Sequence, residues 1–180
     1  MSESPSRYQR SFSGMIGAMI VTLVVIGGFV VFRALNRDNL ELQLEPVDWR
    51  GSVKYIQSQG DTVFYPATEP AGWTATSADY EPGTPSLWAI GFLTSEGEFV
   101  GLHEEAASTR ELVEELVDDE ATEGDPVQLA GRSWRTFSDS GGDFALVAEL
   151  EGQTLIAYGS AGPEVIRDFA ASLTDRPVTG

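Results

Sequence analysis

The hydrophobic pattern is dominated by one uninterrupted apolar run from Gly14 to Phe32, which contains no charged residue. A helix of these 19 residues rises about 1.5 Å per residue and just spans a hydrocarbon core of about 30 Å. The run is longer than the ~7–15 apolar residues of a signal peptide, and it ends in Val31, Phe32 and Arg33 rather than in a small-residue cleavage motif. The sequence therefore predicts one uncleaved transmembrane helix that holds the protein in a lipid bilayer.

The charges beside this run leave its orientation open. Arg7 and Arg10 precede it and Arg33 and Arg37 follow it, so the positive-inside comparison is a tie. We expect the short basic tail to stay in the cytoplasm, which places the rest of the chain outside the cell membrane. The predicted organisation is a cytoplasmic tail at 1–13, a transmembrane helix at 14–32, a tether at 33–46, a soluble extracytoplasmic domain at 47–175 and a C-terminal tail at 176–180.

After residue 46, short alternating segments and amphipathic segments replace the apolar run. Helices are predicted at 48–57, at 108–120 and from Pro163 to about residue 173, and Ser108 and Glu111 have the spacing of a capping box. Strands are predicted at 62–65, 73–80, 87–94, 98–104, 127–130, 133–137, 144–150 and 154–158. Because turns join most strands directly, the predicted fold class is α+β, a mainly antiparallel sheet flanked by helices and preceded by one N-terminal transmembrane helix.

Charge and cysteine content exclude several classes of function. The chain carries a net charge of −17, and from Asp38 onward it has 27 acidic and 7 basic residues. Such a domain repels phosphate backbones, so we expect no nucleic-acid partner. The absence of cysteine excludes disulfides, thiolate metal sites and cysteine catalysis.

One histidine lies beside two carboxylates at the end of a predicted strand. His103, Glu104 and Glu105 could bind a metal or supply a general base. Side chains alternate along a strand, so His103 and Glu105 can share a face and Glu104 points to the other. No second histidine is present, and an exposed strand end is the simpler interpretation.

Three further motifs resemble functional sites but fit structural roles. Acidic residues load the predicted helix 108–120, which has no EF-hand-like loop, so a solvated helix face is favoured over a Ca²⁺ or Mg²⁺ site. Residues 139–142 read Asp-Ser-Gly-Gly like a serine-protease nucleophile, but His103 is too near in sequence for that family, and a hairpin loop is favoured. Residues 159–163 lack the lysine of a phosphate loop and are typical of a strand-to-helix connection.

The four tryptophans, Trp49, Trp73, Trp88 and Trp134, allow two interpretations. Core residues are the more economical one. A surface aromatic patch for a ligand would also use tryptophan, and the pattern leaves both open.

The order of these features resembles a family of uncharacterised single-pass membrane proteins of actinobacteria, known as a domain of unknown function. The motifs that carry the resemblance are Val47-Asp48-Trp49, then Pro70-x-Gly72-Trp73-x-Ala75-Thr76-Ser77, then the hairpin of residues 87–104. The resemblance implies an envelope protein whose domain lies outside the membrane, and it carries over no catalytic residue. In element order the soluble part is also similar to the PsbP-like α/β/α sandwich, whose members are mostly accessory or binding modules.

These observations predict a membrane-anchored extracytoplasmic binding or accessory module of the cell envelope. Its partners would be the lipid bilayer, through residues 14–32, and an envelope protein or small ligand. The alternative is an envelope hydrolase or metal-dependent enzyme that uses His103 and nearby carboxylates. The sequence singles out no catalytic, cofactor-binding or metal residue and no cofactor, and it leaves the oligomeric state open.

Overall fold

The computed structural model describes residues 45–178, so the predicted tail, anchor and most of the tether lie outside the described residues. Within residues 45–178, no helix is long and apolar enough to cross a membrane. The expected α+β class with a mainly antiparallel sheet is confirmed. The elements are α2 (Trp49–Ser58), β1 (Tyr65–Pro66), β2 (Thr74–Glu81), β3 (Leu87–Leu93), β4 (Phe99–Glu105), α3 (Thr109–Leu116), β5 (Thr122–Leu129), β6 (Arg132–Ser138), β7 (Phe144–Glu149), β8 (Thr154–Gly159), α4 (Gly162–Ala171) and β9 (Leu173–Thr174).

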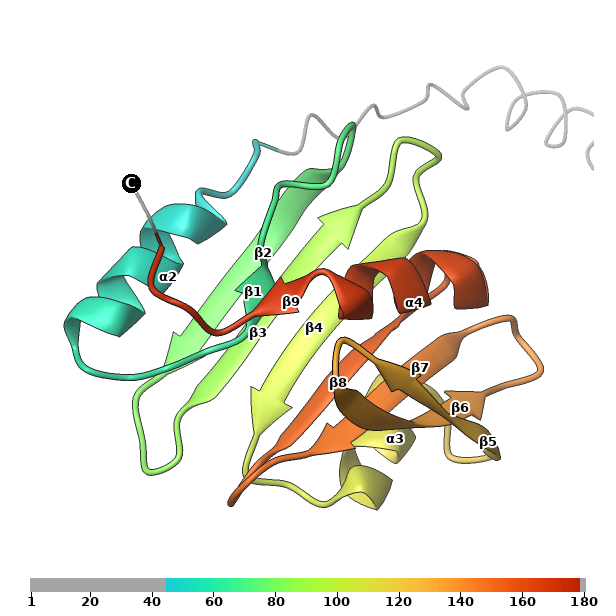
Figure 1. Cartoon of the computed structure of the whole chain (residues 1–180). Helices are drawn as coiled ribbons and strands as arrows, with labels where there is room; N and C mark the ends of the chain where they lie inside the picture. The colour runs from blue at the N-terminus through green and yellow to red at the C-terminus, as the bar shows by residue number, and fades with distance from the viewer. Residues whose placement is uncertain (1–44, 179–180) are drawn as a thin grey trace, which may run out of the picture. The chain divides into compact units, whose positions relative to one another are not determined.

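Seven strands form one antiparallel sheet in the order β2-β3-β4-β8-β7-β6-β5 (Figure 1). Two runs of hairpins, β2 to β4 and β5 to β8, meet where β4 pairs with β8. Strands β1 and β9 form a separate two-stranded sheet in which Tyr65 pairs with Thr174. The segments before β2 and after α4 are thereby joined, although they are far apart in the sequence.

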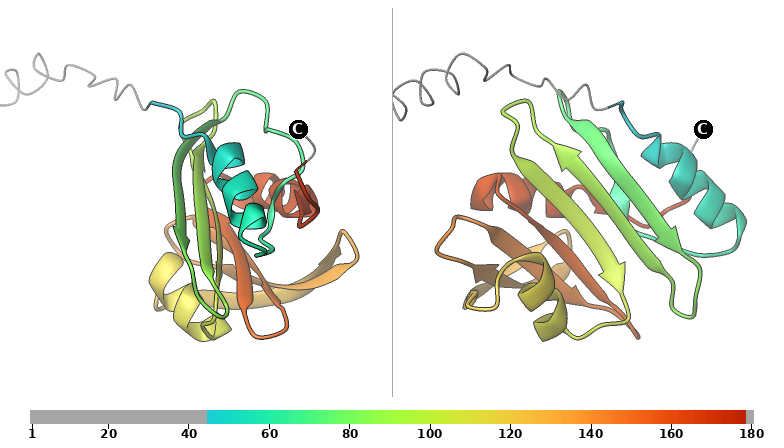
Figure 2. Two further views of the ribbon diagram at one scale, coloured as in Figure 1. Left: turned by 90° about the vertical axis from the view of Figure 1, so that its left-hand side faces the viewer. Right: turned by 180° about the vertical axis from the view of Figure 1, so that it is seen from behind.

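Helices cover both faces of the seven-stranded sheet. Helices α2 and α4 lie on one face and α3 lies on the other, as the side view in Figure 2 shows. Neighbouring residues of one strand serve opposite faces, because side chains alternate along it. Thus Leu146 belongs to the larger core under α2 and α4, and Val147 belongs to the smaller core that includes Leu112 and Val113 of α3.

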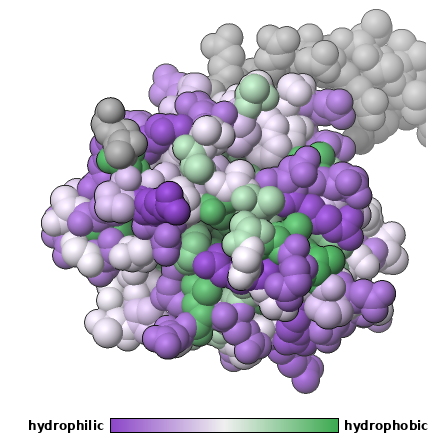
Figure 3. Space-filling view, viewed as in Figure 1, coloured by the Kyte–Doolittle hydropathy of each residue, from purple (hydrophilic) through white to green (hydrophobic). Residues whose placement is uncertain are grey.

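On the face seen in Figure 1, hydrophilic residues form most of the surface and apolar residues show in its middle (Figure 3). The only large apolar side chain that is strongly exposed among the described residues is Tyr55.

The strand predicted at 62–65 is wrong except at its last residue. The backbone amide of Phe64 donates to the Glu104 carboxylate at 3.0 Å, and the Phe64 carbonyl accepts from the Trp88 indole at 2.9 Å. Side chains therefore satisfy this backbone where a neighbouring strand would otherwise do so. Only Tyr65 and Pro66 pair with another strand.

The helix predicted over residues 108–120 ends earlier than expected. Helix α3 begins with the predicted capping box of Ser108 and Glu111 and stops at Leu116. Beyond it, the Asp118 carboxylate accepts from the Glu120 amide at 2.7 Å, a local turn that competes with helix. Acidic residues are also unfavourable at a helix C-terminus. The acidic residues at 118–120 thus lie in the turn before β5.

Strand β5 is longer than the predicted 127–130 and contains Pro126. The strand lies at the sheet edge, and its pairing with β6 is irregular between Gly124 and Val127. Proline cannot donate a ladder hydrogen bond, but an edge strand with a bulge has no need of that donor. The remaining predicted strands and the first and last helices are confirmed. Their observed ends differ from the predicted ones by no more than two residues.

Candidate ligand-binding site

A chain of aromatic rings runs through the larger core and ends at a partly buried tryptophan. Trp49 contacts Phe92 at a centroid distance of 6.0 Å, and Phe92 contacts both Trp73 at 6.0 Å and Phe169 at 5.8 Å. Trp73 and Phe169 stack at 5.8 Å with an angle of 28° between their planes. Three of the four tryptophans, those at 49, 88 and 134, are buried and confirm the core interpretation, whereas Trp73 is only partly buried.

A tight turn sets the position of Trp73. Its backbone amide donates to the Pro70 carbonyl at 3.2 Å, and Gly72 has a φ of 77°. A positive φ at the third residue of a turn is the mark of type II geometry and favours glycine there. The Pro70-x-Gly72-Trp73 motif therefore has a structural role, because its turn places the Trp73 indole at the end of the aromatic chain.

Helix α4 supplies the opposite wall. Pro163 lies in its first turn, where a missing amide costs nothing. Val165 precedes Asp168 and Phe169 by three and four residues, and Ser172 follows them by four and three, so these residues lie along one side of the helix. The Ser172 carbonyl also accepts from the Ala67 amide at 3.0 Å, which ties the loop before β2 to the end of α4.

Trp73 and this face of α4 both line a cavity of about 300 Å³, which lies beside the stacked pair of rings. We call it the aromatic pocket, and its lining residues are Thr68, Pro70, Trp73, Val165, Asp168, Phe169 and Ser172. The walls are apolar and aromatic, with two hydroxyl groups and one carboxylate. This combination of apolar walls and a few polar groups is typical of ligand sites.

His103 and Glu105 share a sheet face, as predicted, and Glu104 faces the other. The His103 Nε2 lies 2.9 Å from a Glu105 carboxylate oxygen, and the His103 side chain is largely buried. Among residues 45–178, no group of three or more histidine, aspartate and glutamate side chains is placed to hold a metal ion. His103 and Glu105 thus form a pair, and Glu104 lies on the opposite face of the sheet. The interpretation of these residues as an exposed strand end is wrong, because the side chains of His103 and Glu104 are both largely buried.

Glu104 lies in the larger core, 2% exposed. Its carboxylate accepts from the Phe64 amide and from the Gln153 side-chain amide. Burial raises the pKa of Glu104 to about 7, which the Phe64 hydrogen bond and the positive charge of Arg132 oppose only in part. Glu104 is not predicted from the sequence as a buried acid. Its position on the same strand face as Val100 and Leu102 is the pattern that would have indicated its burial.

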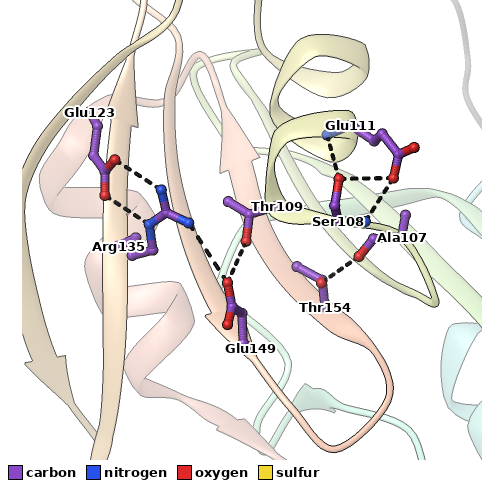
Figure 4. Close-up of polar contacts among 8 residues, drawn as sticks. All are labelled: Ala107, Ser108, Thr109, Glu111, Glu123, Arg135, Glu149 and Thr154. Atoms are coloured by element: carbon purple, nitrogen blue, oxygen red, sulfur yellow. Dashed lines mark hydrogen bonds and ion pairs between the residues drawn. The ribbon is translucent and has the colours of Figure 1, made fainter.

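A second cavity, of about 370 Å³, lies between α3 and β6, but its arginines are already paired. Figure 4 shows Arg135 bound to both oxygens of Glu123, at 2.7 and 2.9 Å, and lying 3.7 Å from Glu149. Glu149 also accepts from Thr109 at 3.1 Å. Arg110 pairs with Glu114 at 2.6 Å. A ligand here would have to displace existing ion pairs, so the aromatic pocket is the stronger candidate.

The other two motifs are connections, as predicted. Asp139 accepts from the backbone amides of Gly142 and Asp143 at 2.7 Å each, which closes the hairpin loop between β6 and β7. Residues 159–163 join β8 to α4, and Ser160 accepts from the Phe99 amide at 3.1 Å. Backbone amides thus engage both polar groups, those of its own loop for Asp139 and that of a β4 residue for Ser160.

The fold and the pocket together define an α+β domain with one aromatic-walled cavity between its last helix and the turn before β2. A family model described as "Protein of unknown function (DUF4245)" matches residues 7–173. The chain belongs to this family. No curated protein matches the chain.

Proposed function

We propose that this protein is a membrane-anchored extracytoplasmic binding module of the cell envelope, with the aromatic pocket as its ligand site. The observation that carries the proposal is the cavity of about 300 Å³ walled by the stacked rings of Trp73 and Phe169. Both rings belong to the continuous aromatic chain of the core, so the walls are fixed before a ligand arrives. Such pre-organisation reduces the ordering cost of binding.

The membrane part of the proposal is supported by the apolar run Gly14 to Phe32. The family model begins at residue 7, so the run is part of the family pattern. The resemblance to single-pass proteins of actinobacteria, and the similarity in element order to PsbP-like accessory domains, point in the same direction. The enzymatic alternative around His103 receives less support, because Glu104 lies on the other face of β4.

Trp73 provides a direct test of the pocket, because the other three tryptophans are buried. The full chain in detergent micelles is treated with acrylamide, and quenching of tryptophan fluorescence is followed as fractions of an envelope extract are added. We expect one fraction to shield Trp73 from the quencher.

A matched pair of variants shows whether the shielding occurs in the pocket. Thr68 lines the pocket and Ala67, its exposed neighbour, does not. Thr68→Arg should abolish the shielding, while Ala67→Arg keeps it and both retain the wild-type melting temperature. If no fraction shields Trp73, or if Thr68→Arg is shielded like wild type, the proposal is wrong.

The enzymatic alternative has its own test. His103→Ala should remove any hydrolytic activity or bound metal detected in the purified full chain. An activity or a metal content unchanged in His103→Ala would end that alternative.

A further inference from the structure

The electrostatics of the aromatic pocket select against anions. Its lining contains no basic residue, and its one charged group is Asp168, which is exposed at the rim. Arg176, four residues after Ser172, is exposed and is not part of the lining. Two other arginines near the walls, Arg167 beside Asp168 and Arg50 opposite Glu69, are engaged elsewhere. Arg167 lies over the Phe144 ring and pairs with Glu164 at 3.1 Å. Arg50 lies over the Trp49 ring and 3.8 Å from Glu69.

Asp168 is the one carboxylate in the lining of the aromatic pocket. Within residues 45–178 it makes no ion pair, whereas Glu164 on the same helix is paired with Arg167. A carboxylate attracts a cation through a charge-assisted hydrogen bond, and a partly buried aromatic ring such as that of Trp73 in the same lining adds the attraction of its quadrupole. The polar part of the pocket is therefore complementary to a positive group.

The apolar part of the pocket favours a cation with a hydrocarbon stem. Val165, Pro70 and the two rings offer apolar surface beneath the rim, and lysine and arginine side chains bury their stems while keeping the charged end near water. The cavity lies at the small end of the ~300–1,000 Å³ range of ligand sites, so one long side chain fills it better than a bulky ligand would. The net charge of −17 would also draw a basic partner towards the domain.

We propose that the aromatic pocket binds the side chain of a lysine or arginine presented by a partner polypeptide, with Asp168 at the charged end and the rings of Trp73 and Phe169 along the stem. This inference rests on the proposed function, since it names the ligand of the same pocket.

The test uses short blocked peptides and the full chain in detergent. The probes are acetyl-Ala-Lys-Ala-amide and acetyl-Ala-Arg-Ala-amide, and their controls carry norleucine or glutamate in the middle position. Shielding of Trp73 from acrylamide, a neutral quencher, reports binding. We expect the basic peptides to bind at least tenfold more tightly than the glutamate peptide, and we expect this preference to shrink as salt is raised.

Two variants test whether the preference for basic peptides depends on the Asp168 carboxylate. Asp168→Asn should reduce the affinity for the basic peptides at least fivefold and leave that for the norleucine peptide unchanged. Glu164→Gln, on the same helix but outside the pocket, should change neither. Melting temperatures show that both variants fold.

The outcomes separate this inference from the proposed function. Equal shielding by the basic, norleucine and glutamate peptides would keep the pocket as a binding site and overturn the assignment of a cation. Shielding by n-butylammonium but not by the lysine peptide would overturn the polypeptide partner in favour of a small amine. If no peptide shields Trp73 but an envelope fraction does, the inference fails and the proposed function stands.

Discussion

At the scale of single residues, Glu104 is the one acidic or basic residue that is buried among residues 45–178. It occupies an inward position of β4, where the alternation of the strand would place an apolar side chain. Its hydrogen bonds come from Phe64 and Gln153, and Arg132 is the nearby positive charge. Asp175 adds a smaller unfavourable negative charge. A buried acid with these partners stabilises the fold best when it holds a proton.

This gives a prediction for stability against pH. The pKa of Glu104 is raised from 4.5 to about 7 in the folded chain, so between these values the folded state binds more protons than the unfolded state. The free energy of unfolding contributed by this group should therefore be highest at low pH and fall as pH rises to about 7, by about 3 kcal/mol at 1.36 kcal/mol per pKa unit.

Chemical denaturation of wild type and Glu104→Gln at a series of pH values measures this contribution. As pH rises from 5 to 8, the free energy of unfolding of Glu104→Gln should increase relative to that of wild type, because glutamine has no charge to bury. Glu151→Gln, a substitution at an exposed glutamate, should follow wild type throughout. A difference that is constant with pH would contradict the assignment.

At the scale of elements, α3 shows how far local sequence specifies a helix. Ser108 caps its N-terminus, and the Glu111 carboxylate returns to the Ser108 backbone amide at 2.9 Å. The helix packs Leu112 and Val113 against the sheet. The cap and the apolar stripe determine where α3 begins. The turn at Asp118 prevents the helix from continuing beyond Leu116.

We therefore expect Ser108→Ala to destabilise the domain by about 1 kcal/mol, because a helix amide loses its partner. Ser108→Gly should cost only a few tenths of a kcal/mol, since glycine is tolerated at N-caps. Thermal or denaturant unfolding of the two variants measures both values. Equal losses in the two would indicate that Ser108 acts by packing rather than as a cap.

At the scale of the whole molecule, two parts of different chemistry are joined. Residues 45–178 form a folded acidic unit, and the run Gly14 to Phe32 has the composition of lipid-facing helix. The loop that carries Trp73 lies at the same end of the folded unit as its first described residues, since Val47 donates to the Ala75 carbonyl at 3.0 Å (Figure 1). The aromatic pocket thus lies towards the end of the folded unit that holds its first described residues.

The prediction at this scale concerns location. The full chain should stay with the membrane fraction after an alkaline carbonate wash, and deletion of residues 14–32 should release it. Reporters fused after Gly180 should be active only outside the cytoplasm. A reporter active only inside would reverse the proposed orientation, and release of the full chain by the wash would remove the anchor.

Features that depend on residues close together in the sequence were predicted well. The hairpin of β3 and β4, the capping box of α3, the proline start of α4 and the opposite faces of His103 and Glu104 all follow from short-range rules of spacing and turn geometry. The same rules failed at residues 62–64, where the side chains of Glu104 and Trp88 bind the Phe64 backbone in place of a strand partner.

The sequence by itself thus determined the fold class, most element boundaries and an acidic domain preceded by an apolar run. Only the tertiary structure decided which tryptophan borders a cavity, that Asp168 stands at its rim and that Glu104 is buried. The physical reason is that the aromatic pocket joins a turn at residues 70–73 to a helix face at residues 165–172. Contacts between such distant segments depend on how the sheet and α4 pack. The local spacing of apolar residues does not specify that packing.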